Sequence, residues 1–462
     1  MLDRAVYVGL ALLLVFTTLA FGATEIWSMT IMQLGVGLLF GVYVIGKIRQ
    51  GRLEIANPDL ILLFVLLALL ALLQVIPWPS HNNARVMQLI TGAPAPSPLP
   101  STTTTLSVYP YATKQALQLL LCYMTIFILA SCLFAQPART GPRRIVPEPD
   151  WLIHLIIFIS FLISALSVLQ CLVPSPILFL FSDEAMLFGP FVNRNHFAGY
   201  MELSIPLVLA IMFLSDLKLE LMVLYGTIAA IMTFSVFLSL SRSGIVTLFV
   251  QLFFMACLLR RSQKTNILGL KGYFMTFAFF LLAGAFFWSN WEQVIYRFFS
   301  IADYVATPVP GRMAVWKDTA AICRDFFWTG SGLGTFVYVY PLYQSVAGKW
   351  EAAHNDYLQL LCEMGMLGFG LAALFIGVAV RRSLSLIQSE SSRNRLAIRV
   401  GSLTSCLGIL LHSFTDFNLQ VPSNAFLFCV LLGIATAHIA PNAAKHSPAT
   451  RPMSERLSEA VV

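Results

Sequence analysis

Long runs of apolar residues alternate with short polar segments along the 462-residue chain. A helix needs about 20 mostly apolar residues to cross the hydrocarbon core of a bilayer, and the runs reach that length repeatedly. The pattern predicts an all-α integral membrane protein with about twelve transmembrane helices. The predicted spans cover residues 5–23, 27–46, 59–77, 113–133, 151–173, 197–215, 220–240, 244–259, 272–289, 356–380, 398–415 and 424–440.

The composition supports this class and excludes two others. Hydrophobic residues make up 58% of the chain and charged residues 11%, with a mean hydropathy of +0.78. Soluble domains carry about 25% charged residues, and disordered chains have low hydrophobicity. The net charge of +7 needs no nucleic-acid partner, because basic residues collect on the cytoplasmic side of membrane proteins. We therefore expect membrane lipids, and no nucleic acid, around the chain.

The basic residues also predict the orientation. With a cytoplasmic N-terminus, the inside segments carry 20 of the 29 Lys and Arg residues and the outside segments carry 9. Positive charges near span ends resist translocation, so both termini are expected in the cytoplasm. Residues 1–189 then contribute N-terminal helices only. Residues 290–355 form a large periplasmic loop between helices nine and ten, and residues 441–462 form a cytoplasmic tail.

The large loop is rich in Trp and Tyr, which suits either a surface at the lipid headgroups or a platform that stacks on sugar rings. The eight cysteines form no CxxC pair, so the sequence favours neither a disulfide framework nor a zinc site. We expect no metal site and no cofactor.

The most informative polar cluster joins the loop to the tenth span. His354 lies at the expected helix start, where the positive end of the helix dipole disfavours the imidazolium and leaves a neutral base. Asn355, Gln359 and Glu363 recur every four residues and place a polar stripe on one helix face. Gly365 and Gly368 would let another helix approach closely. The alternative for His354 is an interfacial histidine that caps the helix.

Two arginines lie on the same predicted face. Arg242 belongs to a Ser-Arg-Ser-Gly turn between spans seven and eight, and Arg312 begins an Arg-x-x-x-Trp sequence in the large loop. Two guanidinium groups on one face could clamp a pyrophosphate, although a single arginine could equally extend its side chain to water.

Two weaker clusters mark further span ends on this face. One contains Arg194 and His196, with Glu202 deeper in the span, and the other contains His412 and Asp416 one helical turn apart. Polar residues that simply mark a span end are the alternative interpretation of both.

These residues resemble the O-antigen ligase family. His354-Asn355, then nine residues, then Gly365-x-x-Gly368 matches its H[NSQ]-x9-G-x-x-[GTY] pattern, and the Ser-Arg-Ser-Gly turn, the Arg-x-x-x-Trp sequence and the stretch 330–336 are similar too. The resemblance covers about residues 190–440. The wider superfamily also includes O-antigen polymerases and pilin O-oligosaccharyltransferases, which these motifs do not separate.

The resemblance implies a metal-independent, inverting glycosyltransferase at the periplasmic face of the bacterial inner membrane. The donor would be a glycan on undecaprenyl pyrophosphate, and the acceptor would be lipid A-core for a ligase or a lipid-linked glycan for a polymerase. His354 would be the catalytic base, and Arg242 and Arg312 would hold the pyrophosphate. Grooves between the spans near Glu202 and span ten would hold the polyprenyl tail. The supporting candidates are Arg194, His196, Asn355, Gln359, Glu363, His412 and Asp416.

The hypothesis from another class is a lipid or sugar transporter. Transporters place ionisable groups or broken helices near the middle of the membrane. The clusters in this chain lie at one predicted face, which favours chemistry there, of the ligase type rather than the polymerase type.

Overall fold

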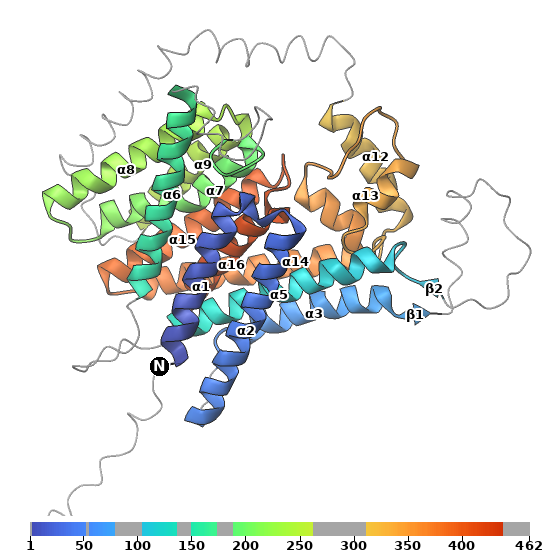
Figure 1. Ribbon diagram of the computed structural model, residues 1–462, viewed down its shortest axis with the longest axis horizontal. Coiled ribbons are helices and arrows are strands. Elements are labelled where there is room, and N and C mark those ends of the chain that lie inside the picture. The colour runs from blue at the N-terminus through green and yellow to red at the C-terminus, as the bar shows by residue number, and fades with distance from the viewer. Residues whose placement is uncertain are drawn as a thin grey trace, which may run out of the picture.

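The computed structural model describes residues 2–51, 55–78, 104–135, 149–172, 188–261 and 311–437. Most of these residues lie in helices (Figure 1). The helices are α1 (Leu2–Leu19), α2 (Ile26–Gln50), α3 (Pro58–Val75), α5 (Pro110–Phe134), α6 (Pro149–Leu172), α7 (Arg194–Leu214), α8 (Leu219–Leu238), α9 (Arg242–Arg261), α12 (Arg312–Asp325), α13 (Phe336–Val339), α14 (Asp356–Ser389), α15 (Arg393–His412) and α16 (Pro422–Thr436). The short 3-10 helices are η1 (Phe21–Ala23), η3 (Tyr340–Leu342) and η4 (Asn418–Gln420).

Within these ranges, nine helices are long and apolar enough to cross a membrane, so the chain is a multi-pass membrane protein. The all-α prediction is confirmed, with one small addition. The two-residue strands β1 (Pro77–Trp78) and β2 (Thr104–Thr105) pair antiparallel. Each predicted span on described residues coincides with a helix, whereas the span at 272–289 lies outside them. The total of twelve spans stays a prediction.

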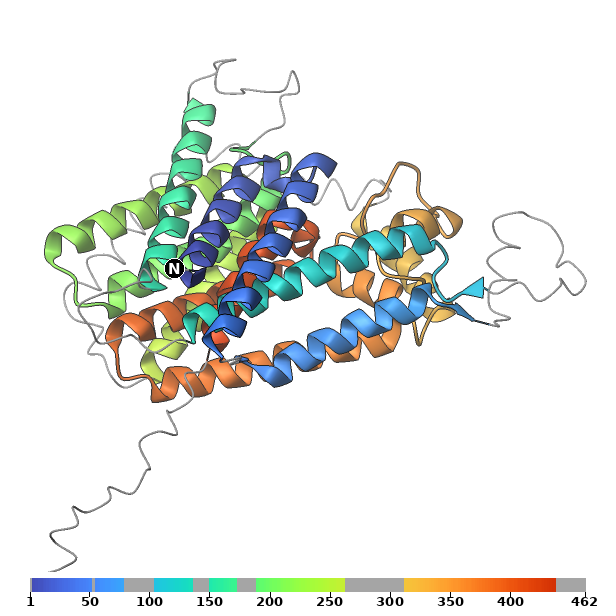
Figure 2. The same cartoon turned by 60° about the horizontal axis from the view of Figure 1, so that its bottom comes forward.

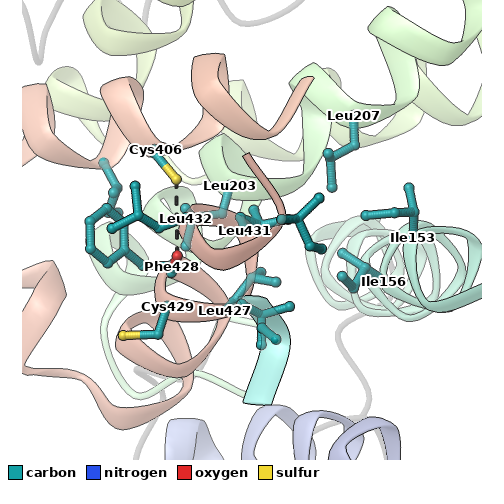
Figure 3. Close-up of a cluster of buried hydrophobic side chains, with 14 of the residues drawn as sticks. Ile153, Ile156, Leu203, Leu207, Cys406, Leu427, Phe428, Cys429, Leu431 and Leu432 are labelled. Carbon is teal, nitrogen blue, oxygen red and sulfur yellow. Dashed lines mark hydrogen bonds between the residues drawn. The ribbon is translucent and has the colours of Figure 1, made fainter. Parts of the chain in front are cut away.

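Helix α7 forms the centre of the bundle. It is the most buried of the nine candidate spans, with 89% of its apolar window enclosed by protein. Figure 3 shows Leu203 and Leu207 of α7 facing Ile153 of α6 and Leu431 of α16 in one apolar cluster. A helix enclosed by other helices can carry polar side chains at membrane depth only when protein groups satisfy them.

Helix α15 begins five residues before the predicted span and ends three residues before its end. Its first turns carry three arginines, and these charges end the apolar run on which the predicted span is based. Arg399 is nevertheless buried, and its Nε atom lies 3.3 Å from Glu390 Oε2. Arg393 pairs with Asp216 of the connection between α7 and α8. These ion pairs allow the helix to extend through its charged segment, which apolar counting cannot detect.

Residues 311–355, called the lobe from here on, form a small folded unit. Val315 and Ile322 of α12 pack against Phe336 and Tyr340 in a separate apolar cluster. The lobe lies at one end of α3, α5 and α14, which run side by side toward it (Figure 2). The predicted loop 290–355 therefore has a compact core in its described part.

Candidate active site

His354 is the second-to-last residue of the lobe and lies two residues before the start of α14. Its backbone is left-handed, with φ 50°, a conformation that non-glycine residues adopt only under constraint. Asn355 follows as the N-cap of α14, and its Oδ1 atom accepts a hydrogen bond from Leu358 N at 3.0 Å. The cap fixes where the helix begins, and the reversed backbone directs the imidazole away from the helix.

The imidazole meets a buried carboxylate. His354 Nδ1 lies 3.1 Å from Asp416 Oδ1, and the side chain of Asp416 is completely buried. Arg312 Nη2 lies 3.1 Å from Asp416 Oδ2, and Asn195 Nδ2 donates to the same oxygen. Phe417 N donates to Oδ1 at 3.0 Å. One carboxylate thus accepts from four donors contributed by three separate parts of the chain.

These donors determine the charge of Asp416. Burial opposes its ionisation, but the His354 hydrogen bond and the Arg312 charge outweigh burial and hold the pKa of Asp416 well below its usual range. A carboxylate has no proton to give, so the proton in the 3.1 Å contact belongs to His354 Nδ1. In the neutral form of the ring, Nε2 is then the proton acceptor.

The Arg-x-x-x-Trp sequence supports the same histidine twice. Arg312 is the first residue of α12 and reaches Asp416, with a second hydrogen bond from Nη1 to Thr415 O. One turn later, Trp316 Nε1 donates to Ala353 O at 2.9 Å. Residues four apart share a helix face, so α12 holds both the partner of His354 and the residue before it.

A second histidine lies one turn before Asp416. His412 Nδ1 lies 2.9 Å from Glu202 Oε1, and both side chains are completely buried. His412 Nε2 lies 2.8 Å from Ser243 Oγ. The Ser-Arg-Ser-Gly turn is thereby placed against the end of α15, next to the Asp416 cluster. Both carboxylate oxygens of Glu202 face His412, and the expected groove for a lipid tail near Glu202 stays a prediction.

Of the weaker candidates, His196 joins the cluster through Phe417. The Phe417 ring lies 4.7 Å from the His196 ring and 4.9 Å from the His354 ring, edge to face in both cases. The Nε2 atom of His196 is buried and has no hydrogen-bond partner within the described residues. Arg194 is the first residue of α7, directly before Asn195 of the cluster.

The polar stripe of α14 forms hydrogen bonds with the lobe. Gln359 Nε2 lies 3.1 Å from Glu363 Oε1, and the Glu363 carboxylate accepts hydrogen bonds from Gly334 N and Phe336 N. Gln359 Oε1 accepts from Ala353 N at 2.9 Å. Both side chains thus fasten the lobe backbone, and Gln359 also holds the residue before His354.

Gly365 breaks α14, which sequence analysis did not predict. Its φ of 63° and ψ of −170° are non-helical, and a Cβ atom there would lie 2.4 Å from the Trp328 carbonyl. The backbone amides freed by the break, Met366 N and Leu367 N, donate to Phe327 O and Trp328 O. The glycine spacing predicted that another helix approaches closely at Gly365. The close neighbour there is instead the lobe backbone.

Asp356 anchors the start of α14 to the segment that follows α15. Its backbone amide donates to Ser413 O, and its carboxylate accepts from Ser413 Oγ at 2.8 Å and from Gln420 Nε2 at 3.0 Å. These contacts hold the segments of His354 and Asp416 together.

Sequence reasoning missed two residues of the cluster, Asn195 and Ser243. Their neighbours were singled out for charge, whereas a neutral amide and a hydroxyl carry no such signal. In the ranges that the structure describes, no group of three or more His, Cys, Asp and Glu side chains is arranged to hold a metal ion.

Comparison with known proteins gives one match. Residues 227–373 match the family model described as O-antigen ligase. No curated protein matches the chain significantly. The matched range contains Arg242, Ser243, Arg312 and His354, while His412 at the end of α15 and Asp416 after it, which bond to three of them, lie outside it. Residues 227–373 are therefore similar to the O-antigen ligase family.

Proposed function

We propose that this protein transfers a glycan from undecaprenyl pyrophosphate to an acceptor hydroxyl at the periplasmic face of the bacterial inner membrane, with lipid A-core as the acceptor. The observation that carries the proposal is the His354–Asp416 contact beside Arg312. It supplies a proton acceptor and a cation at one place, as glycan transfer from a pyrophosphate requires.

In this proposal His354 Nε2 takes the proton of the acceptor hydroxyl as its oxygen attacks the anomeric carbon. The bond from that carbon to the phosphate oxygen breaks, and its electron pair leaves with the pyrophosphate. Asp416 keeps the Nδ1–H tautomer and stabilises the imidazolium as it forms, while remaining ionised. Attack opposite the leaving group inverts the anomeric configuration.

Arg242 and Arg312 would hold the pyrophosphate and stabilise its developing charge. Arg312 uses two of its five N–H groups on Thr415 and Asp416, which leaves three for phosphate oxygens. Its side chain is 38% exposed, so these N–H groups can meet a ligand. Arg242 begins α9 directly before Ser243, which bonds to His412.

We further propose that the working unit spans about residues 190–440, beyond the matched family domain. The support is that His412 and Asp416 contact Ser243 and His354 of the matched range. Glu202 and Asn195 of α7 bond in turn to His412 and Asp416. A unit limited to residues 227–373 would lack every partner of His354 in the cluster.

Reconstitution of the purified protein tests the activity. The protein is supplied with an undecaprenyl-pyrophosphate-linked glycan, with or without lipid A-core. Glycan joined to lipid A-core supports a ligase. Longer lipid-linked glycan, formed from the donor alone, would instead indicate a polymerase. Donor that moves intact across the bilayer, with no new glycosidic bond, would indicate a transporter and contradict the proposal.

A further inference from the structure

Glu202, His412 and Ser243 form a hydrogen-bonded chain that the proposed transfer step does not use. The three residues come from α7, α15 and α9. Glu202 Oε1 and Oε2 lie 2.9 and 3.1 Å from His412 Nδ1, and His412 Nε2 lies 2.8 Å from Ser243 Oγ. Ser243 is separated from His412 by 169 positions, so only the fold brings them together.

The two buried groups constrain each other's charge. An isolated carboxylate in a water-free interior is costly, and an adjacent imidazolium compensates it. Both carboxylate oxygens of Glu202 face the same nitrogen, and Asp416 lies one turn from His412. Burial opposes a charge on His412, but these negative neighbours outweigh burial and favour the doubly protonated ring, although Arg312 and His196 nearby also oppose it.

The charge of His412 decides what Ser243 can offer. If the ring were neutral with its proton on Nδ1, its Nε2 atom would accept a hydrogen bond from the Ser243 hydroxyl. The hydroxyl could then offer a ligand only the lone pairs of its oxygen. An imidazolium instead donates from Nε2 to Ser243 Oγ, which frees the hydroxyl proton to point elsewhere. A hydroxyl in this second state is a donor for an anion.

Ser243 is placed where such a donor is useful. It follows Arg242 directly and is partly exposed, whereas His412 and Glu202 are fully buried. Gly244 makes the placement possible, because a Cβ atom there would lie 2.7 Å from Ala198 Cβ of α7. The close packing of α9 on α7 thus places the Ser243 hydroxyl against His412 and next to Arg242.

We propose that Ser243 donates a hydrogen bond to a phosphate oxygen of the pyrophosphate-linked donor, and that the Glu202–His412 pair acts as a positioning element that keeps its hydroxyl proton directed outward. This inference rests on the proposed function. It assigns no covalent step to Ser243, which donates a hydrogen bond to the leaving pyrophosphate and keeps its proton.

The test is equilibrium binding of undecaprenyl pyrophosphate to the full chain in lipid nanodiscs. Ser243→Ala is expected to weaken binding by about 10- to 100-fold, as for a hydrogen bond to a charged group. Ser243→Thr retains the hydroxyl and is expected to restore most of the affinity. Ser239→Ala is the matched control, because the Ser239 hydroxyl bonds only to backbone groups of the same turn, Val236 O and Ser241 N.

The positioning role has its own readout. Glu202→Gln removes the charge that favours the imidazolium, so it is expected to weaken binding about as much as Ser243→Ala. The double variant should then bind no more weakly than Ser243→Ala alone, because both changes remove the same donor. A merely structural role would instead give additive losses, with lower thermal stability in Glu202→Gln.

The inference is overturned if Ser243→Ala binds undecaprenyl pyrophosphate as tightly as the wild type. It is also overturned by a glycan attached to Ser243 with overall retention of configuration, because Ser243 would then be a nucleophile. In both cases the wild type still transfers glycan, so the proposed activity stands, although retention would overturn the inverting step assigned to His354. A wild-type protein that neither binds the lipid nor transfers glycan would overturn both proposals.

Discussion

His354 Nδ1 and Asp416 Oδ1 lie 3.1 Å apart, although 62 residues separate them in the chain. The carboxylate is completely buried and holds Arg312 as well, so one side chain orients the proposed base and a proposed phosphate ligand. Loss of Asp416 should therefore have two separable effects, one on turnover and one on stability.

Asp416→Asn is expected to lower the transfer rate strongly while the protein still folds. The amide offers an N–H group to His354, which favours the wrong tautomer, and it no longer pairs with Arg312. The transfer rate of the purified variant, compared with that of Asp325→Asn in the lobe, measures this effect. An Asp416→Asn variant with wild-type turnover would remove the tautomer role from the account.

The stability that Asp416 contributes should depend on pH in a defined direction. Its pKa is lower in the folded chain than in the unfolded chain, so ionisation favours the folded state at any pH above the unfolded value of about 4. Thermal unfolding in detergent should show a constant difference between wild type and Asp416→Asn from pH 8 to about pH 5. The difference should shrink only at lower pH. A difference that disappears between pH 8 and 6 would contradict the low pKa.

Arg242→Ala and Arg312→Ala are each expected to weaken donor binding by about 10- to 100-fold, because each removes a charge-assisted contact worth about 1.5–3 kcal/mol. Arg312→Ala should also lower the maximal rate, because Asp416 loses its partner, whereas Arg242→Ala should act mainly on KM. Replacement by Lys should rescue poorly at both positions. Saturation kinetics in the reconstituted assay separate these effects, and full activity in either alanine variant would exclude that arginine.

Gly365→Ala is expected to destabilise the junction of α14 with the lobe. A side chain at φ 63° and ψ −170° is strained by about 1–3 kcal/mol, and its Cβ would also collide with Trp328. Gly370→Ala is the matched control on the same helix, since no atom lies within 4 Å of its added Cβ. Thermal unfolding and limited proteolysis of the lobe measure the difference. Equal behaviour of the two variants would contradict the helix break.

The orientation can be tested with cysteine labelling. Lys349 carries a highly exposed side chain in the lobe, and Ser389 is exposed at the far end of α14. In a background with Cys171 and Cys257 replaced by Ser, a membrane-impermeant maleimide should label Lys349→Cys from the periplasmic side. It should label Ser389→Cys only after the membrane is permeabilised. The reverse pattern would overturn the periplasmic site.

Much of the fold could be predicted because a membrane span needs only a long apolar run, which is a local property of the chain. The break at Gly365 could not, because the apolar run continues through it and its cause is the distant Trp328 backbone. The early start of α15 was missed for a similar reason, since Arg399 is neutralised by Glu390 in three dimensions.

The same distinction between local sequence patterns and distant contacts applies to the candidate site. His354, Arg242 and Arg312 could be singled out because they belong to recognisable motifs on one predicted face. The shared partner of His354 and Arg312 could not be assigned, because Asp416 is 62 and 104 positions away from them. The stripe of Asn355, Gln359 and Glu363 was predicted as a feature, but Asn355 caps α14, and Gln359 and Glu363 bond to the lobe backbone.

The central claim is that His354 is the base of a glycan transfer, and the rate of His354→Ala with saturating donor and acceptor tests it most directly. General-base catalysis contributes about 100- to 10,000-fold, so the account predicts a loss of that size with undecaprenyl pyrophosphate binding nearly unchanged. His154→Ala on α6, far along the chain from the site, serves as the control. A His354→Ala variant that turns over normally once saturated, but binds the donor poorly, would contradict the account and make His354 a positioning residue.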